Sequence, residues 1–132
     1  MGRPKKPRIT IATGKGNKDD VIAERVEGCF AVAKIDDGQP PTGFPNSNLT
    51  APWHLTHVPT GYHIGRFLTK ESAFKALWKM LASELPWDID DPSEIGKSSR
   101  HNVWWEKEYQ PWCAEENKLA AESRGVDDTS AR

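Results

Sequence analysis

The sequence contains only two cysteines, Cys29 and Cys113, among its 132 residues. Two thiols cannot build the dense disulfide framework on which many small secreted domains depend. No apolar run approaches the roughly 18 residues that a membrane-spanning helix needs. The basic N-terminal stretch is followed by an apolar run too short for the core of a signal peptide. We therefore expect a soluble, cytoplasmic, single-domain protein that does not enter the membrane.

Motifs for catalysis and cofactor binding are also lacking. The sequence has no Gly-x-Ser-x-Gly turn, and neither cysteine has a histidine at a diagnostic spacing. Gly14-Lys15-Gly16 has no second glycine followed by lysine and serine or threonine, so it predicts a turn rather than a phosphate-binding loop. The acidic segment 88–94 lacks the glycine and distal glutamate of a calcium-binding loop. These absences predict a protein that is not an enzyme and has no cofactor.

Charge is divided sharply along the chain, although the formal net charge is only −1. Residues 1–18 carry six positive charges and no acid, which leaves the other 114 residues with a net charge of −7. Such a division predicts two different partners, a polyanion for the basic segment and a basic surface for the acidic body. Six tryptophans are the second unusual feature, because a body this small cannot easily bury all of them. We expect part of this indole surface to contact a partner.

The clearest structural pattern lies between residues 53 and 85. Two β-type segments, 53–58 and 62–68, flank Pro59-Thr60-Gly61, which predicts a hairpin with Gly61 in the left-handed conformation. Thr69 is placed to cap a helix over residues 70–85, which Pro86 would end. The apolar residues expected to face the core recur at helical spacing. They are Phe74, Leu77, Trp78, Leu81 and Leu85.

The remaining segments complete a predicted α+β fold. Residues 9–12 and 29–35 predict two more strands, and residues 20–27 favour a short helix, although valine and isoleucine also suit a strand. Asp91, Pro92 and Glu94 fit the cap, first and third positions of one helical turn. A tryptophan-rich helix is expected over 103–123, kinked near Pro111. Its expected inward stripe consists of Trp105, Tyr109, Trp112 and Leu119.

We thus expect a small antiparallel sheet of three to four strands with a hairpin–helix unit and a tryptophan-rich C-terminal helix. Residues 1–8 form a flexible basic arm in this interpretation, residues 9–124 the domain, and residues 125–132 a disordered tail. The sequence leaves the oligomeric state open, with a dimer among the options.

Two histidines raise the alternative of a metal site or a metal-dependent enzyme. The predicted hairpin loop would place His57 and His63 opposite each other on one face, with His54 on the other. Two imidazoles are the beginning of a zinc site, but no further ligand stands at a spacing that supports one. A cross-strand pair at the rim of the core is the other interpretation.

Two segments resemble nucleic-acid-binding motifs. Gly2-Arg3-Pro4-Lys5-Lys6 resembles an AT-hook, which implies contact with the minor groove of DNA, but it lacks the basic residue before the glycine. Gly65 with Thr69-Lys70-Glu71-Ser72-Ala73 is similar to the end of a double-stranded-RNA-binding domain, with Glu71 and Phe74 where that family has lysines. The alternative function is therefore DNA or RNA binding. Its candidate residues are Arg3, Lys5, Lys6, Arg8, Lys15, Lys18, Arg66 and Lys70.

A third resemblance covers about 30 residues. The segment from Trp53 to Tyr62, with Gly65-Arg66-Phe67 and the start of the next helix, resembles small phage- and plasmid-borne proteins of the anti-CRISPR and anti-defence kind. The resemblance implies a non-enzymatic inhibitor that binds a host protein. An acidic body can dock on the basic surface of a nucleic-acid-handling complex, which gives this function a physical basis. The candidate partner-binding residues combine tryptophans with nearby carboxylates. They are Trp87, Asp88, Asp90, Asp91, Glu94, Trp104, Trp105, Glu106 and Glu108.

Overall fold

The computed structural model describes residues 8–13, 16–35, 38–44 and 46–123. Residues 1–7 of the predicted arm and the whole predicted tail lie outside this part of the chain. The α+β class is confirmed, but the sheet has five strands instead of three or four. They are β1 (Arg8–Thr13), β2 (Gly16–Glu27), β3 (Phe30–Lys34), β4 (Trp53–His57) and β5 (His63–Phe67).

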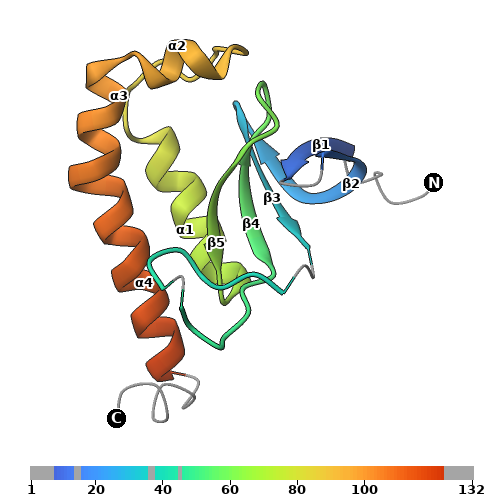
Figure 1. Ribbon diagram of the computed structural model, residues 1–132, viewed down its shortest axis with the longest axis vertical. Helices are drawn as coiled ribbons and strands as arrows, with labels where there is room; N and C mark the ends of the chain where they lie inside the picture. Colours follow the sequence, from blue (N-terminus) through green and yellow to red (C-terminus); the bar gives the residue numbers. More distant parts are fainter. Residues whose placement is uncertain (1–7, 14–15, 36–37, 45, 124–132) are drawn as a thin grey trace.

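The strands form an antiparallel meander in which each strand pairs with the next along the chain. The first part of β2 pairs with β1 and its last part with β3, and the register shifts in both pairings. The sheet curls strongly, as Figure 1 shows, and β1 also contacts β5. The expected helix over residues 20–27 is therefore wrong: that segment is part of β2.

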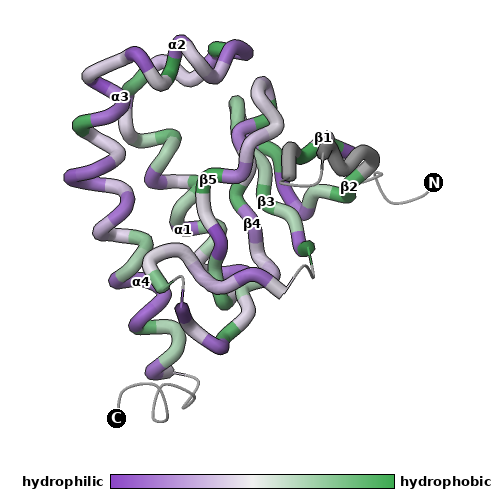
Figure 2. The backbone as a smooth tube through the Cα atoms, in the orientation of Figure 1, coloured by the Kyte–Doolittle hydropathy of each residue, from purple (hydrophilic) through white to green (hydrophobic). Residues whose placement is uncertain are grey.

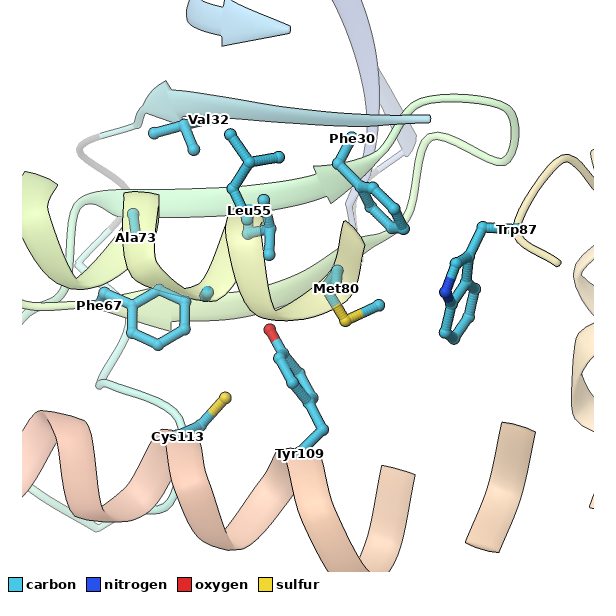
Figure 3. Packing of buried hydrophobic residues seen from close by; sticks show 11 residues of the cluster. Phe30, Val32, Leu55, Phe67, Ala73, Met80, Trp87, Tyr109 and Cys113 are labelled. Atoms are coloured by element: carbon cyan, nitrogen blue, oxygen red, sulfur yellow. The ribbon is translucent and has the colours of Figure 1, made fainter. Parts of the chain in front are cut away.

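The two faces of the sheet carry different cores. Phe30, Val32, Leu55 and Phe67 face the helices and form the larger cluster (Figure 3). Inside the curl lies a second cluster, in which Ala23, Ala31 and Ala33 are completely buried among the isoleucines and Val21. Alanine allows the backbones of facing strands to approach closely because it adds only a methyl group. The small residues of β2 and β3 thus explain how so short a sheet can curl.

Helices cover one face of the sheet. α1 (Lys70–Leu81) lies between the sheet and α4 (Gln110–Ser123), while α2 (Pro92–Gly96) and α3 (Ser99–Trp104) lie beyond one end of the sheet (Figure 1). The predicted cap is confirmed, since the Thr69 hydroxyl accepts a hydrogen bond of 3.0 Å from the Ser72 amide. In the part of the chain that the structure describes, no helix has the length and hydrophobicity to cross a membrane.

α1 ends four residues before the predicted boundary at 85, and its buried face differs from the predicted stripe. Leu77 is buried as expected, but Trp78 and Leu81 are 47% and 38% exposed. The residues against the sheet are smaller, because a helix that packs closely on strands needs short side chains at the contact. They are Ser72, Ala73, Ala76, Leu77 and Met80.

The C-terminal helix begins at Ser99, four residues before the predicted start, and Ser98 caps it. The irregularity expected near Pro111 is a π-helical turn, η1 (Trp105–Tyr109), after which the Gln110 amide bonds to the Trp105 carbonyl. Pro111 has no amide hydrogen and cannot make a helical hydrogen bond. The wider turn before it therefore costs no hydrogen bond at that position. Tyr109, the last residue of the turn, is buried as predicted, but Leu119 on α4 is 50% exposed. Hydrophilic and hydrophobic residues alternate along α4, as Figure 2 shows.

Candidate functional site: an aromatic pocket beside an acidic linker

Two histidines hold the segment that connects α1 to α2. His101 Nε2 lies 2.6 Å from the Pro86 carbonyl oxygen, and His57 Nε2 lies 2.6 Å from the carbonyl oxygen of the next residue, Trp87. A carbonyl only accepts, so Nε2 carries a proton in both rings. Nδ1 of each ring is bonded to a hydroxyl, that of Thr60 for His57 and that of Ser98 for His101. The two rings therefore fix the linker between the hairpin and α3.

This arrangement corrects the predicted histidine pair. A register shift in the β4–β5 pairing places His63 opposite Thr56, not opposite His57. The His63 ring lies against His54, with ring centroids 5.9 Å apart, whereas His57 contacts Phe30. Within the described residues, no group of three or more histidine, cysteine, aspartate or glutamate side chains is arranged to hold a metal ion. The geometry thus gives the zinc interpretation no support.

Burial lowers the pKa of His57, and the nearby His101 lowers it further, against the opposing effect of the hydrogen bond to the Trp87 carbonyl. The folded protein therefore binds a proton at His57 less readily than the unfolded chain does. This contribution to stability is full above the unfolded-state pKa of about 6.5 and is lost as the pH falls below that value.

We expect the free energy of unfolding of the wild-type protein to fall more between pH 7.5 and pH 5.5 than that of a His57→Gln variant. Glutamine can still donate to the Trp87 carbonyl but does not titrate, and His101 is present in both proteins. Urea unfolding at several pH values measures the difference. Parallel pH profiles of the two proteins would contradict the assignment.

Trp87 is the centre of an aromatic cluster rather than an exposed anchor. It is 8% exposed and its indole N–H donates to the Ser83 hydroxyl, so only a small part of its ring is open to a partner. The His101 ring packs edge-on against the Trp87 indole, at 4.5 Å between ring centroids, and helps to hold it in the core. Figure 3 shows Trp87 at one end of the core.

The π-helical turn extends this cluster toward α4. Trp104 stacks on Tyr109 at 5.6 Å and meets Trp87 edge-on at 6.2 Å. Trp105 lies 4.7 Å from the Tyr109 ring as well. Two consecutive tryptophans, one at the end of α3 and one at the start of η1, therefore both contact one buried tyrosine.

A pocket of about 300 Å³ opens between the hairpin end and the α2–α3 segment. Tyr62 and Ile64 line it from the hairpin, Ile95 from α2, and Trp87 and Trp105 from the aromatic cluster. The rest of the lining is His57, Thr60, His63, Pro92, Gly96, His101 and Asn102. Most of this wall is apolar, and pockets of this kind are typical ligand-binding sites.

The sequence did not reveal most of this lining. Of these residues the sequence predicts only Trp87 and Trp105 as partner-binding, and it indicates a metal site or a cross-strand pair for His57 and His63. The hairpin and the residues around α2 meet through non-local packing, so no local pattern could identify Tyr62, Ile95 or Asn102 as neighbours. The nearest signal was the Asp91–Pro92 helix start, which is confirmed.

The predicted carboxylates fall into two groups. Asp88, Asp90, Asp91 and Glu94 are exposed and lie on the segment that contributes Trp87, Pro92 and Ile95 to the pocket. Hydrogen bonds from the Ser93 hydroxyl and amide lower the pKa of Asp91, which caps α2. We call residues 88–94 the acidic linker. Within the described part of the chain, Asp88, Asp90 and Glu94 form no ion pair.

Trp104 and Glu108 belong to a different surface. They line a second, more open hollow of about 450 Å³ together with Val103, Arg100 and Lys107. The two cations beside Glu108 make this surface mixed in charge, unlike the acidic linker. Glu106 is exposed on the same π-helical turn. The predicted partner-binding residues therefore lie on two surfaces. Among the described residues, the first combines an apolar pocket with carboxylates that form no ion pair, and the second mixes acidic and basic side chains.

The residues of the nucleic-acid alternative are scattered or engaged where the structure describes them. Lys70 pairs with Glu24 at 3.2 Å and lies over the Trp53 ring at 5.7 Å. Arg66 is half-buried in β5. Arg8 lies in β1, and the side chain of Lys18 in β2 is not described. Arg3, Lys5, Lys6 and Lys15 lie outside the described residues.

Neither free cysteine is an activated thiol. Burial raises the pKa of Cys29, and the charge of Asp88 raises it further. Burial raises the pKa of Cys113 to about 12, and this thiol packs beside Tyr109 in the core (Figure 3). A reactive cysteine needs a lowered pKa because the thiolate is the nucleophile. Neither thiol therefore has the lowered pKa of an activated nucleophile.

The fold and the pocket together define an α+β meander protein whose helical layer holds an aromatic pocket next to an acidic linker. A scan of this chain against protein-family models, a search of curated proteins and a search of solved structures each return no match.

Proposed function

We propose that this chain is a non-enzymatic binding protein whose acidic linker and pocket dock on a basic surface of another protein and thereby inhibit or modulate it. The observation that carries the proposal is the position of an open apolar pocket directly beside carboxylates that form no ion pair with any described residue. Apolar pockets supply binding energy when a partner side chain fills them. Carboxylates around such a pocket steer and orient a positively charged partner.

Proteins that handle nucleic acids expose basic surfaces, because these surfaces bind phosphates. An acidic protein of this size can compete for such a surface, which agrees with the anti-defence resemblance within residues 53–73. The proposal therefore extends to a nucleic-acid-handling complex as the partner. Attraction between the acidic linker and a basic surface is screened by salt, so we expect association to slow as ionic strength rises.

Replacing Asp88 and Asp90 together by lysine is expected to abolish partner capture and leave the fold intact. Both side chains are exposed and neither caps a helix, whereas Asp91 does and is left unchanged. The matched control is Glu115→Lys with Glu122→Lys, which makes the same charge change at exposed positions of α4. The measurement is affinity capture with the full chain from extract of the organism that encodes it, followed by binding and activity assays with the purified partner.

The extract is divided, and half is treated with nuclease. A complex that survives nuclease, is lost with the linker variant and is kept with the control variant supports the proposal, as does a loss of the partner's activity on binding. Loss of capture after nuclease would favour nucleic-acid binding through the basic N-terminal residues. Equal capture by the two variants would exclude the acidic linker as the docking surface.

A further inference from the structure

The pocket is well suited to receive one side chain of a partner rather than a broad flat surface. Its volume of about 300 Å³ lies at the small end of the range for ligand pockets. The hydrogen-bonding nitrogens of His57 and His101 are already bonded to linker carbonyls and to hydroxyls. With these polar atoms occupied, the wall presents mostly aromatic and aliphatic carbon. An apolar side chain therefore fits it better than a polar one.

The wall is in part accessible. Tyr62, at the start of the hairpin's second strand, is 50% exposed, and Asn102 and Gly96 are also exposed at the opposite side of the pocket. Trp87 and Trp105 form a firmer base, since each packs against another ring of the cluster. A large side chain that enters here covers apolar surface already held in place, which reduces the entropy that binding costs.

Charge complementarity decides what must flank the entering side chain. Asp88, Asp90 and Glu94 are exposed along the segment that forms one wall, and no ion pair of the described residues neutralises them. At ordinary ionic strength the field of exposed charges reaches about 8–10 Å, which covers the residues next to a pocket-bound side chain. Lysine or arginine at those positions would be attracted, and aspartate or glutamate repelled.

From these observations we propose that the pocket binds a single large apolar side chain, such as leucine or phenylalanine, presented by a lysine- or arginine-rich segment of the partner protein. This inference rests on the proposed function and specifies the docking segment. The side chain supplies most of the affinity and the flanking cations supply orientation and speed of association.

The test uses the full chain and defined pentapeptides, Lys-Lys-Leu-Lys-Lys and Lys-Lys-Phe-Lys-Lys, followed by amide NMR. Shift changes are expected around Tyr62, Ile64, Ile95 and Gly96. A peptide with alanine at the centre should bind about tenfold more weakly or worse, because burying a large apolar side chain stabilises a complex by at least that factor. A peptide with glutamates in place of the lysines should not bind measurably.

Gly96→Leu is expected to weaken binding of the leucine peptide at least tenfold while leaving thermal unfolding unchanged. A Cβ added at Gly96 would meet no atom within 4 Å, so the new side chain enters open space beside the pocket. Ala82→Leu, at an exposed position that does not line the pocket, is the matched control. Tyr62→Ala, which removes an exposed part of the wall, provides a second variant if the first does not fold.

The outcomes separate this inference from the function on which it rests. Loss of peptide binding in Gly96→Leu and in the Asp88/Asp90 lysine variant, with the control unchanged, supports both. If Gly96→Leu and Tyr62→Ala both bind the peptide as tightly as the wild type, the pocket inference is overturned. The proposed function still stands in that case if partner capture depends on the acidic linker. Peptide binding that persists in the lysine variant overturns the requirement for basic flanks.

Discussion

Replacing Asn117 with aspartate is expected to lower the free energy of unfolding by about 3 kcal/mol or more, because it buries a charge among carbonyl groups. Asn117 is 1% exposed on α4. Its side-chain oxygen accepts from the Leu68 amide at 3.2 Å. Its side-chain nitrogen donates to the carbonyls of Thr42 and Arg66 at 3.0 and 3.1 Å. The Asn117 side chain thus joins α4 to the end of β5 and to the segment around Thr42.

Aspartate has the same shape but cannot donate when ionised, so both carbonyls would face a second acceptor. Its pKa in the folded state should lie above that in the unfolded state, because burial and the carbonyls disfavour the charge. The penalty is therefore full above the folded-state pKa and decreases as the pH falls through it. This pH dependence distinguishes a buried charge from a simple packing defect.

Chemical denaturation at pH 7.5 and at pH 4 measures the effect. Asn48→Asp makes the same substitution at an exposed position of the segment before β4 and should change stability by less than about 0.5 kcal/mol. If the two variants unfold at the same denaturant concentration, Asn117 does not connect the segments as described.

The hairpin–helix unit was predictable because its signals are local. Pro59 and Gly61 define the turn within a few residues, and Gly61 has the expected positive φ of 78°. Thr69 caps the helix from one position before its start. β2 was not predictable in the same way, because Val21, Ile22 and Val26 suit a helix or a strand, and pairing with β1 and β3 decides between them.

The buried face of α1 shows a second limit of sequence patterns. Large apolar residues at helical spacing predicted Trp78 and Leu81 inside, yet α1 turns its small residues to the sheet. Trp78 instead covers part of the surface with the Arg25 guanidinium 5.2 Å from its ring. Hydrophobicity alone cannot predict whether the large or the small apolar residues of α1 face the sheet. The distance between the helix and the sheet determines which side chains fit between them.

The acidic half of the candidate site was predictable from the sequence, but of the pocket lining only Trp87 and Trp105 were. The carboxylates of the linker and its helix cap are adjacent in sequence, whereas the pocket needs the hairpin, α2 and η1 to meet. The residues that fix this meeting are a pair of histidines on two backbone carbonyls and a buried tyrosine. Each looks ordinary in the sequence, since its role arises from contacts with distant segments.

The position of the Tyr109 ring requires that residue 65 has no side chain. Gly65→Ala is expected to lower the free energy of unfolding by about 2–3 kcal/mol, because the added methyl group overpacks the core. An added Cβ would lie 2.6 Å from Phe67 Cε2 and 2.8 Å from the Tyr109 hydroxyl oxygen. Gly65 has no positive φ, so the cost is steric and not conformational. Figure 3 shows the Tyr109 hydroxyl pointing away from its own helix into the core beside Phe67.

Removing one of the two obstacles should rescue part of this loss. Among the described residues the Tyr109 hydroxyl has no oxygen or nitrogen partner and only the weakly bonding Cys113 thiol beside it, so Tyr109→Phe alone should cost little. A double-mutant cycle of Gly65→Ala with Tyr109→Phe should then give a favourable coupling of about 1 kcal/mol, the remainder being the clash with Phe67. Gly96→Ala, where the added group meets nothing within 4 Å, is the control and should be close to neutral. Because Trp105 packs on Tyr109, Gly65→Ala should also weaken binding of the leucine peptide. If the effects of Gly65→Ala and Tyr109→Phe on stability are strictly additive, the added methyl group and the Tyr109 hydroxyl do not compete for the same space.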